Sequence, residues 1–170
     1  SLVSQSLREW TAEATDPIHA FVVCSDTKVG KDEEDIRTHD LAYPATTDAR
    51  KLAKAAQAIS TDRRTVVFST YQSIQVVADA QALGLGEFDL IICDEAHRTT
   101  GLTLQGEDPT EFLKVHHNHI VRGKKRVYMT ATPRIFADTS KTRANEAGAV
   151  LFSMDDEETF GREFYRLGFG

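Results

Sequence analysis

Short apolar runs recur along the chain, separated by polar or amphipathic segments. The runs are nearly continuous in hydrophobicity and do not alternate with polar residues, which is typical of strands covered on both faces in a parallel sheet. They occupy residues 20–24, 65–68, 90–93, 126–129 and, more weakly, 149–152. The pattern therefore predicts the strands of a mainly parallel sheet.

Helical periodicity fills most of the stretches between these runs. The strongest apolar stripe lies on one face of a helix that Asp48 can begin, and it consists of Leu52, Ala55, Ala56 and Ile59. Helices are predicted over residues 3–14, 48–60, 71–84 and 109–117. Strands that alternate with helices indicate the α/β class.

Two polar stretches interrupt this alternation. Residues 26–44 are acidic at their centre, and residues 99–108 are rich in Gly and Thr. Both are predicted to be exposed loops outside the α/β core.

Composition and charge limit the classes of function. The 170 residues, of which 41% are hydrophobic and 27% charged, are those of an ordinary globular domain. No apolar run approaches the ~20 residues that span a bilayer. The net charge of −6 argues against a protein that coats nucleic acid by charge alone, but not against one that grips it locally. Cys24 and Cys93 lie inside apolar runs without CxxC spacing, so we expect buried free thiols in a reducing cytoplasm.

Two adjacent acids follow the third apolar run. Ligands of open parallel α/β sheets bind at the carboxyl ends of the strands. Asp94 and Glu95 stand there, where carboxylates are unfavourable unless a cation joins them. Magnesium bound to a nucleoside triphosphate is the natural candidate. We expect Asp94 to hold Mg²⁺ through its water shell, and Glu95 to orient or deprotonate the attacking water.

The acids belong to a recognisable motif. Asp94-Glu95-Ala96-His97 resembles the DEAH form of the Walker B motif in superfamily-two helicases and translocases. Further along, Thr130-Ala131-Thr132 follows another apolar run and resembles the third motif of that family, which couples the ATP site to the nucleic-acid track. The resemblance implies ATP and Mg²⁺ as cofactors, catalytic roles for Asp94, Glu95 and His97, and hydrogen bonds from the hydroxyls of Thr130 and Thr132 to His97.

A third segment is a candidate for contacts to nucleic acid. Thr70-Tyr71-Gln72-Ser73 follows the second apolar run and opens a predicted helix, where hydroxyls and backbone N–H groups suit phosphate. The segment resembles motif Ib of the DNA translocases of restriction enzymes, which implies that Thr70 and Ser73 touch the backbone of duplex DNA. Helix capping by Ser69 or Thr70 is the simpler alternative.

Together these motifs resemble the first motor lobe of type I, type III and, most closely, single-chain type ISP restriction enzymes. The resemblance implies a RecA-like P-loop NTPase lobe over residues 1–170, containing motifs Ia, Ib, II and III, with residues 153–170 leading toward a second lobe. The implied partners are that lobe and nuclease, methylase or target-recognition domains, in a prokaryotic cytoplasm and away from membranes.

One expected motif is absent. No GxxxxGK(S/T) phosphate loop occurs in the sequence. The segment at residues 29–32 resembles the end of such a loop, but Asp32 stands where the hydroxyl residue is needed, and the neighbouring acids would repel phosphate. The resemblance places the P-loop before Ser1, so the P-loop strand is missing from the sheet. We expect these residues alone neither to hydrolyse ATP nor to move on DNA.

Several alternatives stay open. An RNA helicase lobe and a non-catalytic interaction module without a P-loop are the rival functions. His116, His117 and His119 form a cluster that is better explained as a solvated helix end than as a metal site. Residues 124–126 are basic and suit a surface turn or a phosphate contact equally.

Overall fold

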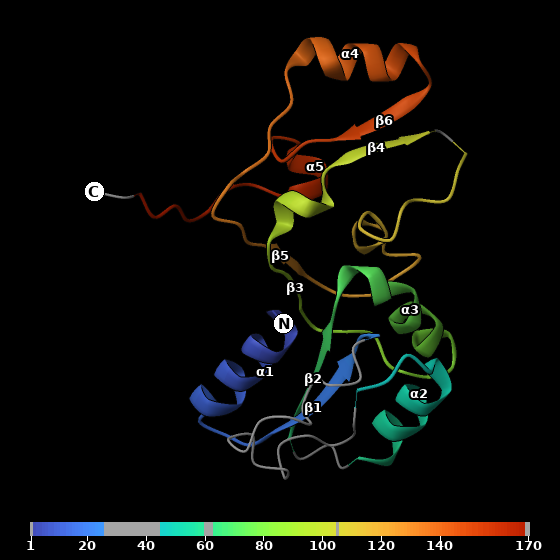
Figure 1. Ribbon diagram of the computed structural model, residues 1–170, viewed down its shortest axis with the longest axis vertical. Helices are drawn as coiled ribbons and strands as arrows, with labels where there is room; N and C mark the ends of the chain where they lie inside the picture. The colour runs from blue at the N-terminus through green and yellow to red at the C-terminus, as the bar shows by residue number, and fades with distance from the viewer. Residues whose placement is uncertain (1, 26–44, 60–62, 105, 169–170) are drawn as a thin grey trace. The chain divides into compact units, whose positions relative to one another are not determined.

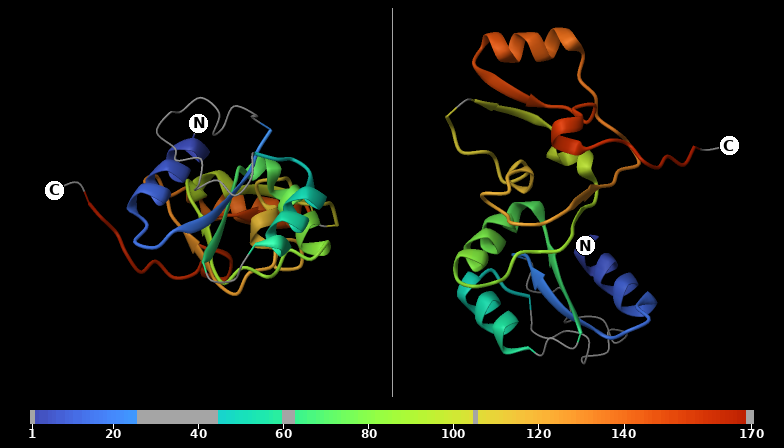
Figure 2. Two further views of the ribbon diagram at one scale, coloured as in Figure 1. Left: turned by 90° about the horizontal axis from the view of Figure 1, so that it is seen from below. Right: turned by 180° about the vertical axis from the view of Figure 1, so that it is seen from behind.

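The computed structural model describes residues 2–25, 45–59, 63–104 and 106–168, and they form two compact units (Figures 1 and 2). Unit 1 comprises Ser1–Glu87 with Asn118–Arg122, and unit 2 comprises Phe88–His117 with Gly123–Gly170. The loop expected at residues 26–44, which includes the rejected phosphate-loop segment at residues 29–32, lies outside the described residues. Within the described part of the chain, no helix is long and apolar enough to cross a bilayer.

Unit 1 is a parallel strand pair between helices. Its elements are, in order, α1 (Leu2–Glu13), β1 (Ile18–Val23), α2 (Ala49–Ala58), β2 (Arg64–Ser69), the 3-10 turn η1 (Tyr71–Ser73) and α3 (Ile74–Ala82). β1 and β2 run parallel, from Ile18 opposite Arg64 to Val23 opposite Ser69. α1 lies on one side of the pair, and α2 and α3 lie on the other (Figure 1). The predicted parallel pairing and the three predicted helices of this unit are confirmed.

The core of unit 1 follows from the apolar run of β1. Its buried cluster consists of Leu7, Ile18, Ala20, Val22 and Cys24, against which Phe68 of β2 packs. Trp10 of α1 meets the Phe68 ring edge-on, with ring centroids 6.1 Å apart. Asp48 caps α2 as predicted, because its side chain accepts hydrogen bonds from the amides of Arg50 and Lys51.

A buried glutamine ties α3 to a distant part of the chain. Gln81 is 3% exposed, and its Nε2 donates to the carbonyls of Gly86 and Arg122. Its Oε1 accepts from the Arg122 amide at 2.7 Å, and the Arg122 guanidinium donates to the Gln81 carbonyl. Residues 118–122 are thereby held in unit 1, immediately before the segment that leads to Arg126.

Replacing Gln81 by Leu is expected to lower the local unfolding free energy by about 2–4 kcal/mol, because three backbone groups lose their buried partner. Hydrogen exchange of the Arg122 amide, whose N–H bonds Gln81 Oε1, measures this directly. Gln57→Leu is the matched control, since exposed Gln57 makes one bond, to the Leu83 carbonyl. An Arg122 amide that exchanges equally slowly in both variants would contradict the assignment.

Unit 2 contains two strand pairs. β3 (Ile91–Cys93) and β5 (Arg126–Tyr128) run parallel, and β4 (Gly101–Leu104) and β6 (Ala149–Phe152) run antiparallel. α4 (Asp138–Glu146) packs against β6, and α5 (Glu157–Phe160) follows it. Two 3-10 turns, η2 (Ala96–Thr99) and η3 (Lys114–His116), complete the unit. The parallel pairing of β3 and β5 is the one on which the interpretation of Asp94 and Glu95 depends.

Three features of unit 2 differ from the predictions. The exposed loop predicted at residues 99–108 is wrong for Gly101–Leu104, where alternating Leu and Thr form a strand of an antiparallel ribbon. β6 was predicted as part of the parallel sheet, but it runs antiparallel because its partner is β4. The helix predicted over residues 109–117 is wrong, because the segment forms turns and the short 3-10 helix η3 instead of an α-helix.

Candidate functional site

The two acids lie where β3 ends. Asp94 directly follows Cys93 and is exposed, and its Oδ1 accepts a hydrogen bond of 2.9 Å from the Glu95 amide. Glu95 has φ 50° and ψ 44°, a left-handed conformation that costs a residue with a side chain about 1–3 kcal/mol. The left-handed residue turns the chain sharply, so that η2 begins at Ala96 immediately after the strand.

Backbone hydrogen bonds join the ends of β3 and β5. The Met129 amide donates to the Cys93 carbonyl at 2.9 Å, and the Ala96 amide donates to the Met129 carbonyl at 2.8 Å. The parallel pairing therefore continues past both strands. It brings the turn after Asp94 beside the turn that begins at Thr130.

His97 connects these two turns. Its Nδ1 lies 2.9 Å from Thr130 Oγ1, 3.4 Å from Thr132 Oγ1 and 3.3 Å from Glu95 Oε2. The contact expected between His97 and the threonine hydroxyls is confirmed, and the shorter distance makes Thr130 the main partner. The Thr132 amide donates to Thr130 Oγ1 at 3.2 Å, which closes the turn around exposed Ala131. One imidazole nitrogen is thus shared between a carboxylate and two hydroxyls.

Asp94 offers a single carboxylate, which fits a Mg²⁺ ion whose other ligands are water and phosphate oxygens. No group of three or more His, Cys, Asp or Glu side chains that could hold a metal occurs among the residues that the structure describes. A cation at Asp94 would take one carboxylate from the protein and its remaining ligands from water and phosphates. Mg²⁺ prefers this arrangement, because it keeps several of its waters.

The predicted track contacts lie in unit 1, at the end of β2. Thr70 precedes η1, and its side chain makes no capping bond to the backbone, so the alternative of simple capping by Thr70 is wrong. Thr70 Oγ1 donates instead to Ser73 Oγ at 3.1 Å, and Ser69 Oγ donates to the Thr70 carbonyl. Ser73 is 8% exposed, whereas Gln72 is exposed. Ser73 is therefore placed to hold Thr70, and Thr70 and Gln72 face outward more than Ser73 does.

The other predicted clusters have structural partners. His119 is exposed, but His116 is half-buried and bonded through both ring nitrogens, so the solvated helix end is wrong for His116. Lys124 pairs with Asp89 at 2.6 Å, and its hydrogen bond and positive charge lower the pKa of that carboxyl. Cys24 and Cys93 are buried and are not joined in a disulfide, as predicted.

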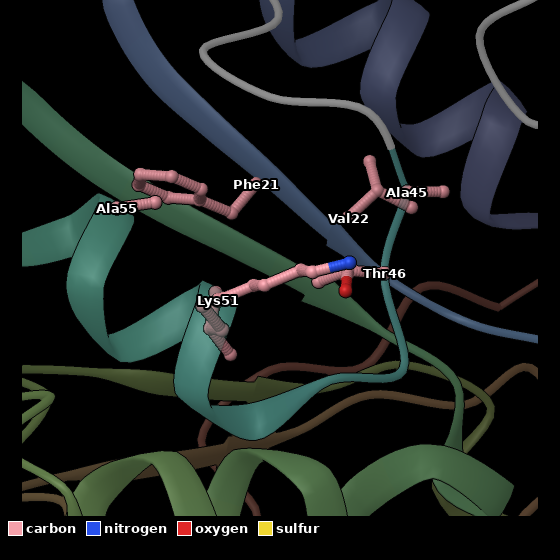
Figure 3. Close-up of a pocket in the computed structure, with 7 residues that line it drawn as sticks. Phe21, Val22, Ala45, Thr46, Lys51 and Ala55 are labelled. Atoms are coloured by element: carbon pink, nitrogen blue, oxygen red, sulfur yellow. The ribbon is translucent and has the colours of Figure 1, made fainter.

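A small pocket in unit 1 contains none of the predicted site residues. It lies beside β1 and α2 and is lined by Phe21, Val22, Ala45, Thr46, Lys51, Leu52 and Ala55 (Figure 3). Among the described residues that line it there is no carboxylate, imidazole or thiol, and Lys51 extends its side chain along it toward Thr46 (Figure 3). Its described lining is mainly apolar.

Comparison with known proteins decides the family. The family described as "Type III restriction enzyme, res subunit" (ResIII) matches residues 1–135. The chain belongs to the ResIII family. No curated protein matches this ResIII chain.

Two solved structures resemble the ResIII chain over 98% of its length. One is a nuclease-deletion mutant of the type ISP restriction-modification enzyme LlaGI in complex with a DNA substrate mimic, with 38% identity and a TM-score of 0.73. The other is the ATP-dependent type ISP restriction-modification enzyme LlaBIII bound to DNA, with 40% identity and a TM-score of 0.69. The ResIII chain covers 12% and 11% of these two chains, respectively.

The comparisons agree with the predicted fold and family. The α/β class with parallel strands between helices, and the RecA-like type of motor domain, are confirmed. The family is one of helicase-related subunits of restriction enzymes. The resemblance to type ISP and type III motors, based on residues 70–73, 94–97 and 130–132, is likewise confirmed.

Proposed function

We propose that this chain is part of an ATP-dependent motor that moves on duplex DNA within a restriction-modification enzyme. The observation that carries the proposal is the bond of 2.9 Å between His97 Nδ1 and Thr130 Oγ1, which joins the turns at the ends of two parallel strands. A carboxylate pair alone would suit many hydrolases. A carboxylate pair linked through an imidazole to a second strand end suits a motor, because a change at the phosphate can then move a neighbouring segment.

Each residue of the site has a separate task in this proposal. Asp94 would hold Mg²⁺ through water, and bound Mg²⁺–ATP would supply the phosphoryl group together with the cation that neutralises its charge. Glu95 orients the attacking water and accepts its proton. The Nδ1 of His97 changes its main partner between Glu95 and Thr130. Ala131 and Thr132 complete the turn that moves when this partner changes. We therefore assign the chain to the DEAH type of superfamily two.

The contacts to DNA fall to the residues after β2. Thr70 and Gln72 approach the phosphate backbone at the start of η1 and α3, where backbone N–H groups and the helix dipole favour anions. Tyr71 and Ser73 hold this turn, Ser73 through its hydroxyl bond with Thr70. These contacts position the motor without reading bases.

The remaining parts of the motor come from outside this sequence in the proposal. A GxxxxGK(S/T) loop is absent from residues 1–170, so the triphosphate must be gripped by another segment. Residues 1–170 form a first-lobe segment, and residues 153–170 lead toward the second lobe. Nuclease, methylase or target-recognition domains complete the enzyme, which acts in the prokaryotic cytoplasm. By themselves residues 1–170 are inactive.

ATP hydrolysis by the whole protein that carries this chain tests the proposal. Hydrolysis should rise at least tenfold with duplex DNA and little with single-stranded RNA, and ATP should drive displacement of a third strand from a triplex on that duplex. Stimulation by RNA alone would establish the RNA helicase alternative. An absence of hydrolysis with either nucleic acid would favour the interaction module.

A further inference from the structure

His116 joins the two segments that carry the candidate site. It lies in η3, and its Nε2 is 2.7 Å from the carbonyl oxygen of Thr99 at the end of η2. Its Nδ1 is 2.9 Å from the hydroxyl of Tyr128 at the end of β5. The imidazole therefore links the turn that follows Asp94 and Glu95 to the strand that precedes Thr130.

The direction of these hydrogen bonds is fixed. A carbonyl oxygen only accepts, so His116 Nε2 carries the proton and Nδ1 accepts from the Tyr128 hydroxyl. Burial lowers the pKa of His116 to about 4, with His117 and Arg126 acting in the same direction and the Thr99 carbonyl and Asp156 opposing. Burial also raises the pKa of Tyr128 above its usual value. Both side chains are neutral in any ordinary assay, and each has one hydrogen-bonding arrangement.

Aromatic rings hold the imidazole in place. The Phe152 ring of β6 stacks on it with an interplanar angle of 7° and a centroid distance of 5.1 Å. The Phe160 ring of α5 meets it edge-on at 4.9 Å and meets Tyr128 at 5.0 Å. Packing on two sides and hydrogen bonds at both nitrogens leave the ring little freedom.

The turn η2 is consequently fixed at both ends. Its first residue, Ala96, donates to the carbonyl of Met129, which directly follows β5, and the carbonyl of its last residue, Thr99, is bonded to His116. Thr99 is fully buried, and its hydroxyl donates to the Ala96 carbonyl at 2.8 Å. Between these anchors the Nδ1 of His97 lies within reach of both Thr130 Oγ1, at 2.9 Å, and Glu95 Oε2, at 3.3 Å.

We propose that His116 is a positioning residue of the motor, which holds the η2 backbone against β5 so that ATP hydrolysis changes the partner of His97 and leaves the turn in place. The proposal rests on the proposed function of Glu95, His97 and Thr130. In this proposal His116 and Tyr128 determine how efficiently ATP hydrolysis is converted into movement on DNA. It gives them no contact with ATP or DNA.

The test measures the number of ATP molecules hydrolysed per base pair moved by the whole protein. His116→Phe keeps the ring on Phe152 and removes both hydrogen bonds, and Tyr128→Phe removes a single oxygen. We expect Tyr128→Phe, which removes one hydrogen bond, to raise the ratio about tenfold, and His116→Phe, which removes two, to raise it at least as much. In both variants the KM for ATP should change less than twofold. His116→Gln restores a donor and an acceptor and should recover part of the loss. His119→Gln, at an exposed histidine, is the matched control.

The outcomes separate this proposal from the proposed function. A wild-type protein without DNA-stimulated hydrolysis would overturn both. A wild-type ratio in His116→Phe and Tyr128→Phe would overturn only the role of His116. A parallel loss of hydrolysis, ATP affinity and stability in His116→Phe, without a change of the ratio in Tyr128→Phe, would reduce His116 to a structural residue and overturn the positioning role.

Discussion

Replacing Glu95 by Gln in the whole protein is expected to lower DNA-stimulated ATP hydrolysis about a thousandfold. The substitution keeps the size of the side chain, but it removes the carboxylate that orients the attacking water and accepts its proton. It also removes the charge that lies 3.3 Å from His97 Nδ1. A steady-state assay of phosphate release at saturating ATP and DNA measures the loss in kcat.

Glu107→Gln is the matched control for this prediction. Glu107 is an exposed acid of the same unit, in the stretch that follows β4, and its substitution should leave kcat within twofold of wild type. Binding of ATP and DNA should survive in both variants, since neither position grips a ligand in the proposal. A Glu95→Gln protein that retains a tenth or more of the wild-type kcat would show that another group activates the water.

Thr130→Val is expected to separate hydrolysis from movement. The substitution keeps the shape of the side chain and removes the hydroxyl 2.9 Å from His97 Nδ1. Because the two carboxylates are untouched, hydrolysis should stay within about fivefold of wild type, whereas DNA movement in the triplex-displacement assay should fall at least tenfold. Thr132→Val should have a smaller effect in the same direction, because its hydroxyl lies farther away, at 3.4 Å.

The matched control is Thr142→Val in α4. Among the described residues the hydroxyl of Thr142 bonds only within its own helix, to the Asp138 carbonyl, and the residue is exposed. It should leave both activities unchanged. If Thr130→Val lowered hydrolysis and movement by the same factor, the hydroxyl would serve catalysis, and the coupling role would be wrong.

The sequence predicted the parallel strands well because their signal is local. A continuous apolar run followed by polar residues marks where a buried strand ends, and this pattern alone puts Asp94 and Thr130 at the ends of two such strands. The contact between His97 and the threonine hydroxyls was expected from the resemblance to superfamily-two motors, and the apolar pattern alone did not predict it. Periodicity likewise identified α2, since its apolar stripe and its cap at Asp48 are both local features.

The ribbon of β4 and β6 escaped prediction for a different reason. Its strands pair across a long stretch of chain, and two exposed leucines, Leu102 and Leu104, alternate with threonine in a segment that Gly and Thr made resemble a loop. α4 escaped because it is polar almost throughout and buries only Ala144, so it has no apolar stripe to detect. Non-local pairing and weak amphipathicity leave no short-range pattern.

The role of His116 could not be found from the sequence. A histidine within a short cluster of histidines suggests metal or solvent, and nothing nearby in the sequence indicates that its partners are Thr99 and Tyr128. Only the folded chain brings these three residues together. The left-handed conformation of Glu95 was equally hidden, because sequence patterns assign such conformations to Gly or Asn far more readily than to Glu.

The division of labour between Asp94 and Glu95 is tested most directly by equilibrium binding of a fluorescent ATP analogue to the whole protein at increasing Mg²⁺ concentrations. We predict that Mg²⁺ increases the affinity of Glu95→Gln for the analogue by the same factor as in the wild type. In Asp94→Asn this factor should be at least tenfold smaller. An Asp94→Asn protein whose affinity rises with Mg²⁺ as steeply as that of wild type would contradict the account.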